Sequence, residues 1–184
     1  MAADEILDVV DEQDRVIGQK LRSELYAAGQ KNFRVVNAFI EDSRGLILIP
    51  RRSQERKMFP GALDTSVGGH VLAGEDYLDA LIRETREECG LDVLGPDASY
   101  RLVRKLTPYE SPVSAFMHFY LIQSKVKPQL CQREFSSYDW EDAKTLLARL
   151  QPGQEMWKDD LPILLRVIID DHARPETRDD SRMP

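Results

Sequence analysis

The chain has 184 residues, of which 42% are hydrophobic and 31% charged, and its formal net charge is -7. This length suits one globular domain, and the acidic balance argues against a protein that binds nucleic acid through a basic face. No run of residues approaches the roughly 18 apolar positions of a membrane span, and the acidic start MAADEILDVVDE lacks the apolar stretch of a signal peptide. We therefore expect a cytoplasmic protein that partners neither nucleic acid nor a membrane.

The first fifty residues predict a hairpin, a short helix and two further strands. Residues 6–10 and 15–18 read as strands joined by a turn, and residues 21–28 as a helical piece ended by Gly29. Residues 34–40 (RVVNAFI) form the next expected strand. Residues 46–50 (LILIP) are expected to pair back against it through the turn at residues 42–45. Residues 1–30 are thus predicted to pack as a hairpin and helix on the main body.

A basic loop, residues 51–61, comes next, and residues 63–67 lead into the pair Gly68-Gly69. Residues 76–89 then place apolar side chains at intervals of three and four, which predicts an amphipathic helix. Gly90 is a typical residue for ending it. Cys89 lies on the apolar side of this helix, so we expect a buried free thiol and no disulfide with Cys131.

The second half predicts strands at residues 100–106 and 113–122, a further strand at 135–140 and a helix at 141–150. Residues 113–122 (VSAFMHFYLI) are apolar on both faces, which indicates a central strand covered on both sides. Asp159 or Asp160 is expected to cap a final helix that ends near residue 171. We expect one α/β (α+β) domain over residues 1–172 and a disordered polar tail over residues 173–184.

The chemistry of the chain is concentrated in residues 69–91 (GHVLAGEDYLDALIRETREECGL). They follow the spacing G-x5-E-x7-R-E-x-x-E-E-x-G, through Gly69, Glu75, Arg83, Glu84, Glu87, Glu88 and Gly90. On a helix, Glu84, Glu87 and Glu88 share one face, away from the apolar stripe. Their repulsion would weaken a bare helix, so a cation is expected to offset it, and carboxylate oxygens suit Mg²⁺ or Mn²⁺. The alternative, a solvated charged face, does not explain seven positions at fixed spacing.

This segment resembles the Nudix box, the signature of the Nudix hydrolase superfamily. Thr85 is the one departure, because an aliphatic residue usually stands there, although its methyl group can still face the core. The order of predicted elements is also similar to the Nudix fold, an α/β/α sandwich with a mixed central sheet. The resemblance implies a divalent-metal-dependent hydrolase that cleaves a diphosphate linkage in a nucleoside diphosphate derivative by attack of water on phosphorus.

Roles carried over from the family fall on the same residues. Glu87 and Glu88 are implied metal ligands, and Glu84 is either a third ligand or the base that activates water. Arg83 is implied to orient a glutamate, and Glu75 to support the junction between loop and helix. The carbonyl of Gly68 or Gly69 is a further implied ligand. Members of the family often bring another acidic residue from a later loop, and Glu134 is the candidate here.

The basic loop suggests how a substrate could be held. Arg51, Arg52 and Lys57, with Arg56 beside them, could clamp a diphosphate through charge-assisted hydrogen bonds, or could simply keep the loop solvated. Phe59, in the same loop, is a candidate for contact with the substrate. The box does not identify the substrate, which could be any diphosphate from nucleoside phosphates to isoprenoid diphosphates. Many members of the family dimerise, so a homodimer is a candidate assembly.

Two other functions compete with hydrolysis. The first half of the chain is also similar to type I isopentenyl diphosphate isomerase and a Nudix branch related to it. Gly68, however, stands where that isomerase has its catalytic cysteine, and Phe33-Arg34 stand where it has a metal-binding histidine. Only His70 matches, so we predict no isomerase activity. A binding module without catalysis usually has an eroded box, whereas this box keeps every charged position.

Overall fold

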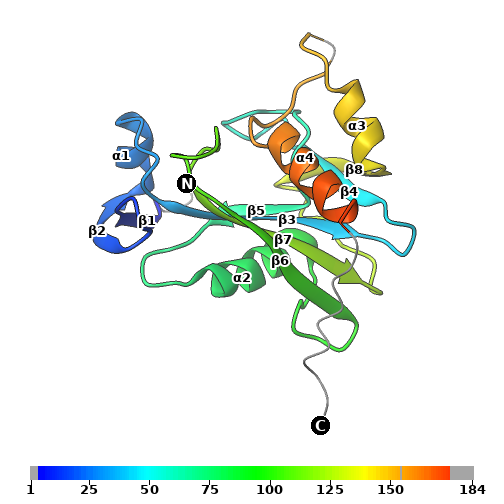
Figure 1. The fold of residues 1–184 in the computed structure, drawn as a ribbon, viewed down its shortest axis with the longest axis horizontal. Helices are drawn as coiled ribbons and strands as arrows, with labels where there is room; N and C mark the ends of the chain where they lie inside the picture. Colours follow the sequence, from blue (N-terminus) through cyan, green and yellow to red (C-terminus); the bar gives the residue numbers. More distant parts are fainter. Residues whose placement is uncertain (1–3, 154, 175–184) are drawn as a thin grey trace.

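A computed structural model describes residues 4–153 and 155–174 of the chain (Figure 1). Its elements in chain order are β1 (Ile6–Val10), β2 (Val16–Leu21), α1 (Arg22–Ala27), β3 (Arg34–Glu41), β4 (Ile47–Arg52), β5 (Val67–His70), α2 (Tyr77–Cys89), β6 (Ala98–Leu106), β7 (Phe116–Ser124), β8 (Phe135–Glu141), α3 (Ala143–Arg149) and α4 (Leu161–His172). The predicted disordered tail falls mostly on residues 175–184, which lie outside the described residues.

A mixed sheet forms the middle of the molecule. Its strand order is β6-β7-β3-β4-β8, with β5 paired to β3 beside this path, while β1 and β2 form a separate hairpin. Strands β3 and β7 are parallel, and the other pairs of the sheet are antiparallel. The predicted central strand is confirmed as β7, which is paired on both edges and is mostly buried.

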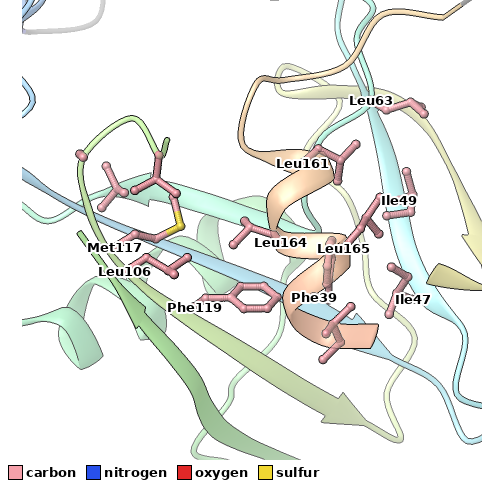
Figure 2. Packing of buried hydrophobic residues seen from close by; sticks show 14 of the residues in the cluster. Phe39, Ile47, Ile49, Leu63, Leu106, Met117, Phe119, Leu161, Leu164 and Leu165 are labelled. Carbon is pink, nitrogen blue, oxygen red and sulfur yellow. The ribbon is translucent and has the colours of Figure 1, made fainter. Parts of the chain in front are cut away.

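Apolar side chains cover both faces of this sheet. On one face, Phe39 and Phe119 meet edge to face and pack with Leu164 and Leu165 of α4 (Figure 2). On the other face, α2 buries Leu81 and Cys89 against the opposite side of β3 and β7. Helices α4 and α2 thus lie on opposite sides of the sheet, which confirms the predicted α/β/α sandwich (Figure 1).

The predicted pairing of residues 46–50 against residues 34–40 is largely wrong. Strand β4 meets β3 only where Glu41 faces Ile47, and it pairs along its length with β8. Ser66 explains the divergence, because its hydroxyl accepts a hydrogen bond from the Ile40 amide at 2.8 Å and donates one to the Leu48 carbonyl at 2.6 Å. One buried side chain therefore bridges β3 and β4 where a direct backbone ladder was expected.

Helix α2 forms where the periodicity predicted it. The Asp76 carboxylate accepts hydrogen bonds from the amides of Leu78 and Asp79, each at 2.8 Å, which caps the first turn. At the other end, Gly90 adopts φ 63°, a left-handed conformation that glycine adopts without steric cost. Cys89 and Cys131 are both free thiols, and Cys89 is buried, as predicted.

Asp160 does not cap helix α4 through its side chain, although such a cap was expected of Asp159 or Asp160. It is the residue before α4, but its side chain makes no capping hydrogen bond. Its carboxylate instead accepts hydrogen bonds from the amide and the hydroxyl of Ser114, at 3.1 and 2.7 Å. Asp160 thus connects the start of α4 to the loop that precedes β7.

Candidate active site

The pair Gly68-Gly69, of which Gly69 is the first residue of the box, lies in strand β5 directly against helix α2 and not in an open loop. A Cβ atom added at Gly69 would come within 1.9 Å of Oε1 of Glu84. Only glycine therefore lets the Glu84 carboxylate rest on this strand. The glycine at the start of the motif and the glutamate fifteen positions later are thus two sides of one contact.

Arg83 connects the parts of the box. Its guanidinium donates two hydrogen bonds to Glu75, both at 2.9 Å, one to Glu84 at 2.6 Å and one to the His70 carbonyl at 2.8 Å. Glu75 also accepts the amide of Leu72 at 2.9 Å, at the entry to the helix. Arg83 thereby ties strand β5, the connecting loop and the helix into one unit around the Glu84 carboxylate.

The three glutamates do not share one solvated face. The Glu87 side chain is 60% exposed, while that of Glu84 is 12% exposed and Glu88 is buried. Glu88 accepts the Gly68 amide at 2.9 Å. The expectation that all three carboxylates point away from the core is therefore wrong for Glu88, because this side of α2 packs on β5.

Burial raises the pKa of two of these carboxylates. Burial raises the pKa of Glu84 to about 7, although Arg83 opposes the shift. Burial and the nearby charge of Glu84 raise the pKa of Glu88 well above its usual value. Two adjoining carboxylates that resist ionisation in the absence of further positive charge form a donor set that suits a hard divalent cation.

The side chains as they stand do not yet enclose an ion. Within residues 4–153 and 155–174, no three His, Cys, Asp or Glu side chains are close enough to hold a metal ion together. Glu84 is engaged with Arg83, and Glu88 with Gly68. The carboxylate oxygens of Glu84, Glu87 and Glu88 fit Mg²⁺ or Mn²⁺ in kind.

His70 is held by the N-terminal part of the chain. Its Nε2 lies 3.1 Å from the Tyr26 hydroxyl of α1, and its Nδ1 lies 3.2 Å from a carboxylate oxygen of Glu5. Phe33 and Tyr26 pack around the ring at centroid distances of 5.8 and 6.0 Å. Both ring nitrogens therefore already have partners, and the segment before β3 forms one wall of the site.

Apart from Arg52, which was predicted as a substrate-binding residue, sequence reasoning missed a second group of polar residues beside Gly68. Asp64 accepts a hydrogen bond from buried Arg52 at 2.6 Å, and Asn37 accepts one from Thr65 at 2.9 Å. Lys158, from the segment before α4, reaches this group with Nζ 3.5 Å from Asp64. No motif marks these residues, because they come from four separate stretches of the chain.

The arginines of the basic loop, which were expected to bind phosphate or to remain solvated, form ion pairs with carboxylates of the chain. Arg51 pairs with Glu155 at 2.5 Å, and Arg52 is committed to Asp64. Arg56 pairs with Glu134 at 2.7 Å, so the carboxylate that was expected at the metal is bound by a guanidinium here.

Two other residues of this loop, Lys57 and Phe59, differ from these paired arginines. Lys57 is exposed, and Phe59 is half-buried with φ 51°. The substrate-binding roles of Arg51, Arg52, Lys57 and Phe59, and the metal-site role of Glu134, remain predictions.

Comparison with known proteins decides the family. Residues 31–161 match the family model described as the NUDIX domain. The chain belongs to the Nudix family. It is 48% identical over 150 residues to an uncharacterised Nudix hydrolase of Nostoc sp., covering 82% of this chain and 88% of that protein. It is 42% identical over 165 residues to a Nudix hydrolase of Deinococcus radiodurans, covering 89% and 94%.

The Nudix fold is equally clear in three dimensions. A crystal structure of a protein from Deinococcus radiodurans superposes with a TM-score of 0.82 at 41% identity, and covers 88% of this chain and 98% of that one. The predictions of a Nudix hydrolase and of its fold are thus confirmed. Enzymes of this family act on small molecules and generally use divalent metals. Among the described helices, none is both long and apolar enough to cross a bilayer.

Proposed function

We propose that this Nudix protein hydrolyses a diphosphate linkage in a nucleoside diphosphate derivative, with Mg²⁺ or Mn²⁺ as cofactor. The observation that carries the proposal is the convergence of Arg83, Glu84 and Glu88 on the glycine pair of β5. This arrangement places two largely buried carboxylates and one fixed guanidinium against the two residues of β5 that lack side chains, Gly68 and Gly69.

Glu84, Glu87 and Glu88 are the proposed metal ligands, with the Gly68 carbonyl as a further oxygen donor. A bound divalent ion supplies charge neutralisation for the phosphate oxygens and lowers the pKa of a bound water. Glu84 serves as a third ligand or takes the proton from the attacking water. Arg83 fixes the direction of the Glu84 carboxylate through the 2.6 Å hydrogen bond.

An isomerase is disfavoured by two features. Gly68 carries no group that can move a proton, and a side chain there would begin 2.7 Å from Oδ1 of Asn37. His70, the one residue that matches the isomerase, has both ring nitrogens bound by Tyr26 and Glu5. Incubation of isopentenyl diphosphate with the protein and Mg²⁺ is expected to give no allylic product.

The test of the proposal is a hydrolysis screen with Mg²⁺ over nucleotide and non-nucleotide diphosphates, ranked by kcat/KM. Glu88→Gln and Glu87→Gln are expected to lower kcat/KM of the best substrate by about 100-fold or more, because each removes a proposed ligand. Asp79→Asn, an exposed acid on the same helix, is the control and should be unchanged. Full activity in both glutamate variants would place the metal site elsewhere.

A further inference from the structure

Lys158 lies beside the proposed metal site but comes from outside the box. Two backbone hydrogen bonds hold its segment: the Leu63 amide donates to Met156, and the Lys158 amide donates to Leu63, each at 2.9 Å. The segment leads directly into α4, above the sheet (Figure 1). The fold therefore fixes the Lys158 backbone against Leu63, four residues before the start of the strand that carries Gly68.

The ammonium group of Lys158 is directed at that strand. A Cβ atom at Gly68 would lie 3.5 Å from Lys158 Nζ. The amide of the same glycine binds Glu88 at 2.9 Å, so the positive charge of Lys158 lies close behind the buried carboxylate. The Lys158 side chain is 27% exposed, so it is largely enclosed and still partly open to solvent.

The acids around Lys158 already have closer partners. Asp64 is bound by Arg52 at 2.6 Å, Asp160 by the Ser114 hydroxyl at 2.7 Å, and Glu88 by the Gly68 amide. In the described part of the chain, the closest ion-pair contact of Lys158 Nζ is the 3.5 Å approach to Asp64. An ammonium group has three donors, so Lys158 retains hydrogen-bonding capacity toward a ligand.

The arginines of the basic loop differ in this respect. Arg51, Arg52 and Arg56 each contact a carboxylate at 2.5 to 2.7 Å. To clamp a phosphate, each would have to give up a short ion pair. Lys158 is the more loosely paired cation near Glu88, and its flexible stem lets the ammonium move by a few ångströms.

We propose that Lys158 is a substrate-binding residue that donates a charge-assisted hydrogen bond to a phosphate oxygen of the diphosphate held at Glu88. The inference rests on the proposed function. The negative surroundings support a charged ammonium group, because burial lowers the pKa of Lys158 but the charges of Asp64 and Asp160 outweigh it and keep the pKa above its usual value. Lys158 would thus complete the site from the C-terminal part of the chain.

Calorimetric titration with methylenediphosphonate, a diphosphate that cannot be hydrolysed, in the presence of Mg²⁺ tests this role. Lys158→Met is expected to weaken its binding by about 10- to 100-fold, the usual loss for a hydrogen bond between charged groups. In the hydrolysis assay the same variant should raise KM more than it lowers kcat. Lys144→Met, an exposed lysine on α3, is the matched control and should bind as the wild type does.

A second variant separates binding from folding. Lys158→Gln keeps a hydrogen-bond donor toward Asp64 without the charge, and it should fold and lose binding like Lys158→Met. Wild-type affinity for methylenediphosphonate in either folded variant would overturn the role of Lys158. If the wild-type protein itself neither binds this probe nor hydrolyses any diphosphate, the proposed function fails instead.

Discussion

At the scale of single residues, the proposed site depends on a glycine as much as on its charged side chains. Gly69 matters because Glu84 occupies the space where its side chain would be. Glu84 has little freedom to move away, since Arg83 holds its carboxylate at 2.6 Å. We therefore expect Gly69, the first position of the box, to matter more for the geometry of the proposed site than for folding.

Gly69→Ala tests this distinction. The added methyl should displace the Glu84 carboxylate by an ångström or more, which is expected to lower kcat by about 100-fold. Thermal stability should fall less than activity, because the atoms that must move belong to a side chain and not to the backbone, although the hydrogen bond from Arg83 to Glu84 is disturbed. Circular dichroism melting beside steady-state kinetics would check it, and a variant that loses stability but keeps kcat would contradict this account.

Thr85 illustrates the cost of a departure from the family pattern. It is fully buried, and its hydroxyl is the one buried side-chain polar atom without a hydrogen-bond partner among the described residues. Thr65 is also buried, but its hydroxyl donates to Asn37 at 2.9 Å and contacts the Val67 carbonyl at 3.1 Å. The two threonines are therefore both buried but differ in whether the hydroxyl has a hydrogen-bond partner, which makes them suitable for comparison.

Thr85→Val is expected to raise the free energy of unfolding by about 1 kcal/mol, because it removes an unpaired buried hydroxyl at constant shape. Thr65→Val should lower it by about 1–3 kcal/mol, since it leaves the Asn37 oxygen without its donor. Urea denaturation measures both. The two substitutions are expected to change the free energy of unfolding in opposite directions, and destabilisation by Thr85→Val would contradict the prediction.

At the scale of secondary-structure elements, the sheet is opened between β3 and β4 by Ser66. Its hydroxyl serves the Ile40 amide and the Leu48 carbonyl at once. This bridge places the segment before β5 between the two strands and so helps to bring Gly68 and Gly69 to the helix. Removing it leaves two buried backbone groups without partners.

Ser66→Ala should therefore lower the free energy of unfolding by about 2–4 kcal/mol. Ser43→Ala, in the exposed turn after β3, is the control and should stay within about 0.5 kcal/mol of the wild type. Chemical denaturation of the three proteins gives the comparison. A loss no larger than that of the control would mean that water or a relaxed backbone replaces the bridge.

Elements with local signals were predictable from the sequence. The periodicity of α2, its Asp76 cap and Gly90 are all encoded within fifteen residues, and β7 was recognisable from its apolar run. The pairing of β4 with β8 was not, because it joins segments about ninety residues apart. Lys158 and Asp64 escaped notice for the same reason: each is an ordinary charged residue until the fold brings it to Gly68.

At the scale of the whole molecule, acid stability is expected to depend on His118. Its ring stacks on Tyr77 at a centroid distance of 3.5 Å. Burial, helped by nearby Lys105 and Arg34, lowers its pKa to about 4, against the weaker opposing charges of Asp14 and Asp76.

The folded pKa of His118 is therefore lower than the unfolded value of about 6.5, so the unfolded chain binds more protons between these limits. The contribution of His118 to stability is fully present above pH 6.5 and is lost as the pH falls toward 4. Unfolding of His118→Phe, measured beside the wild type across this window, should show a relative gain for the variant on the order of 1 kcal/mol after solvent screening. A pH-independent difference between them would exclude this coupling.

Hydrolysis of the best diphosphate substrate in ¹⁸O-labelled water, with the products read by mass spectrometry, tests the central claim most directly. We expect one ¹⁸O atom in one phosphate product per turnover when Mg²⁺ or Mn²⁺ is present. Turnover should stop after chelation and fall by about 100-fold or more in Glu88→Gln. Cleavage that persists without divalent metal, or product oxygen that does not come from water, would contradict the account.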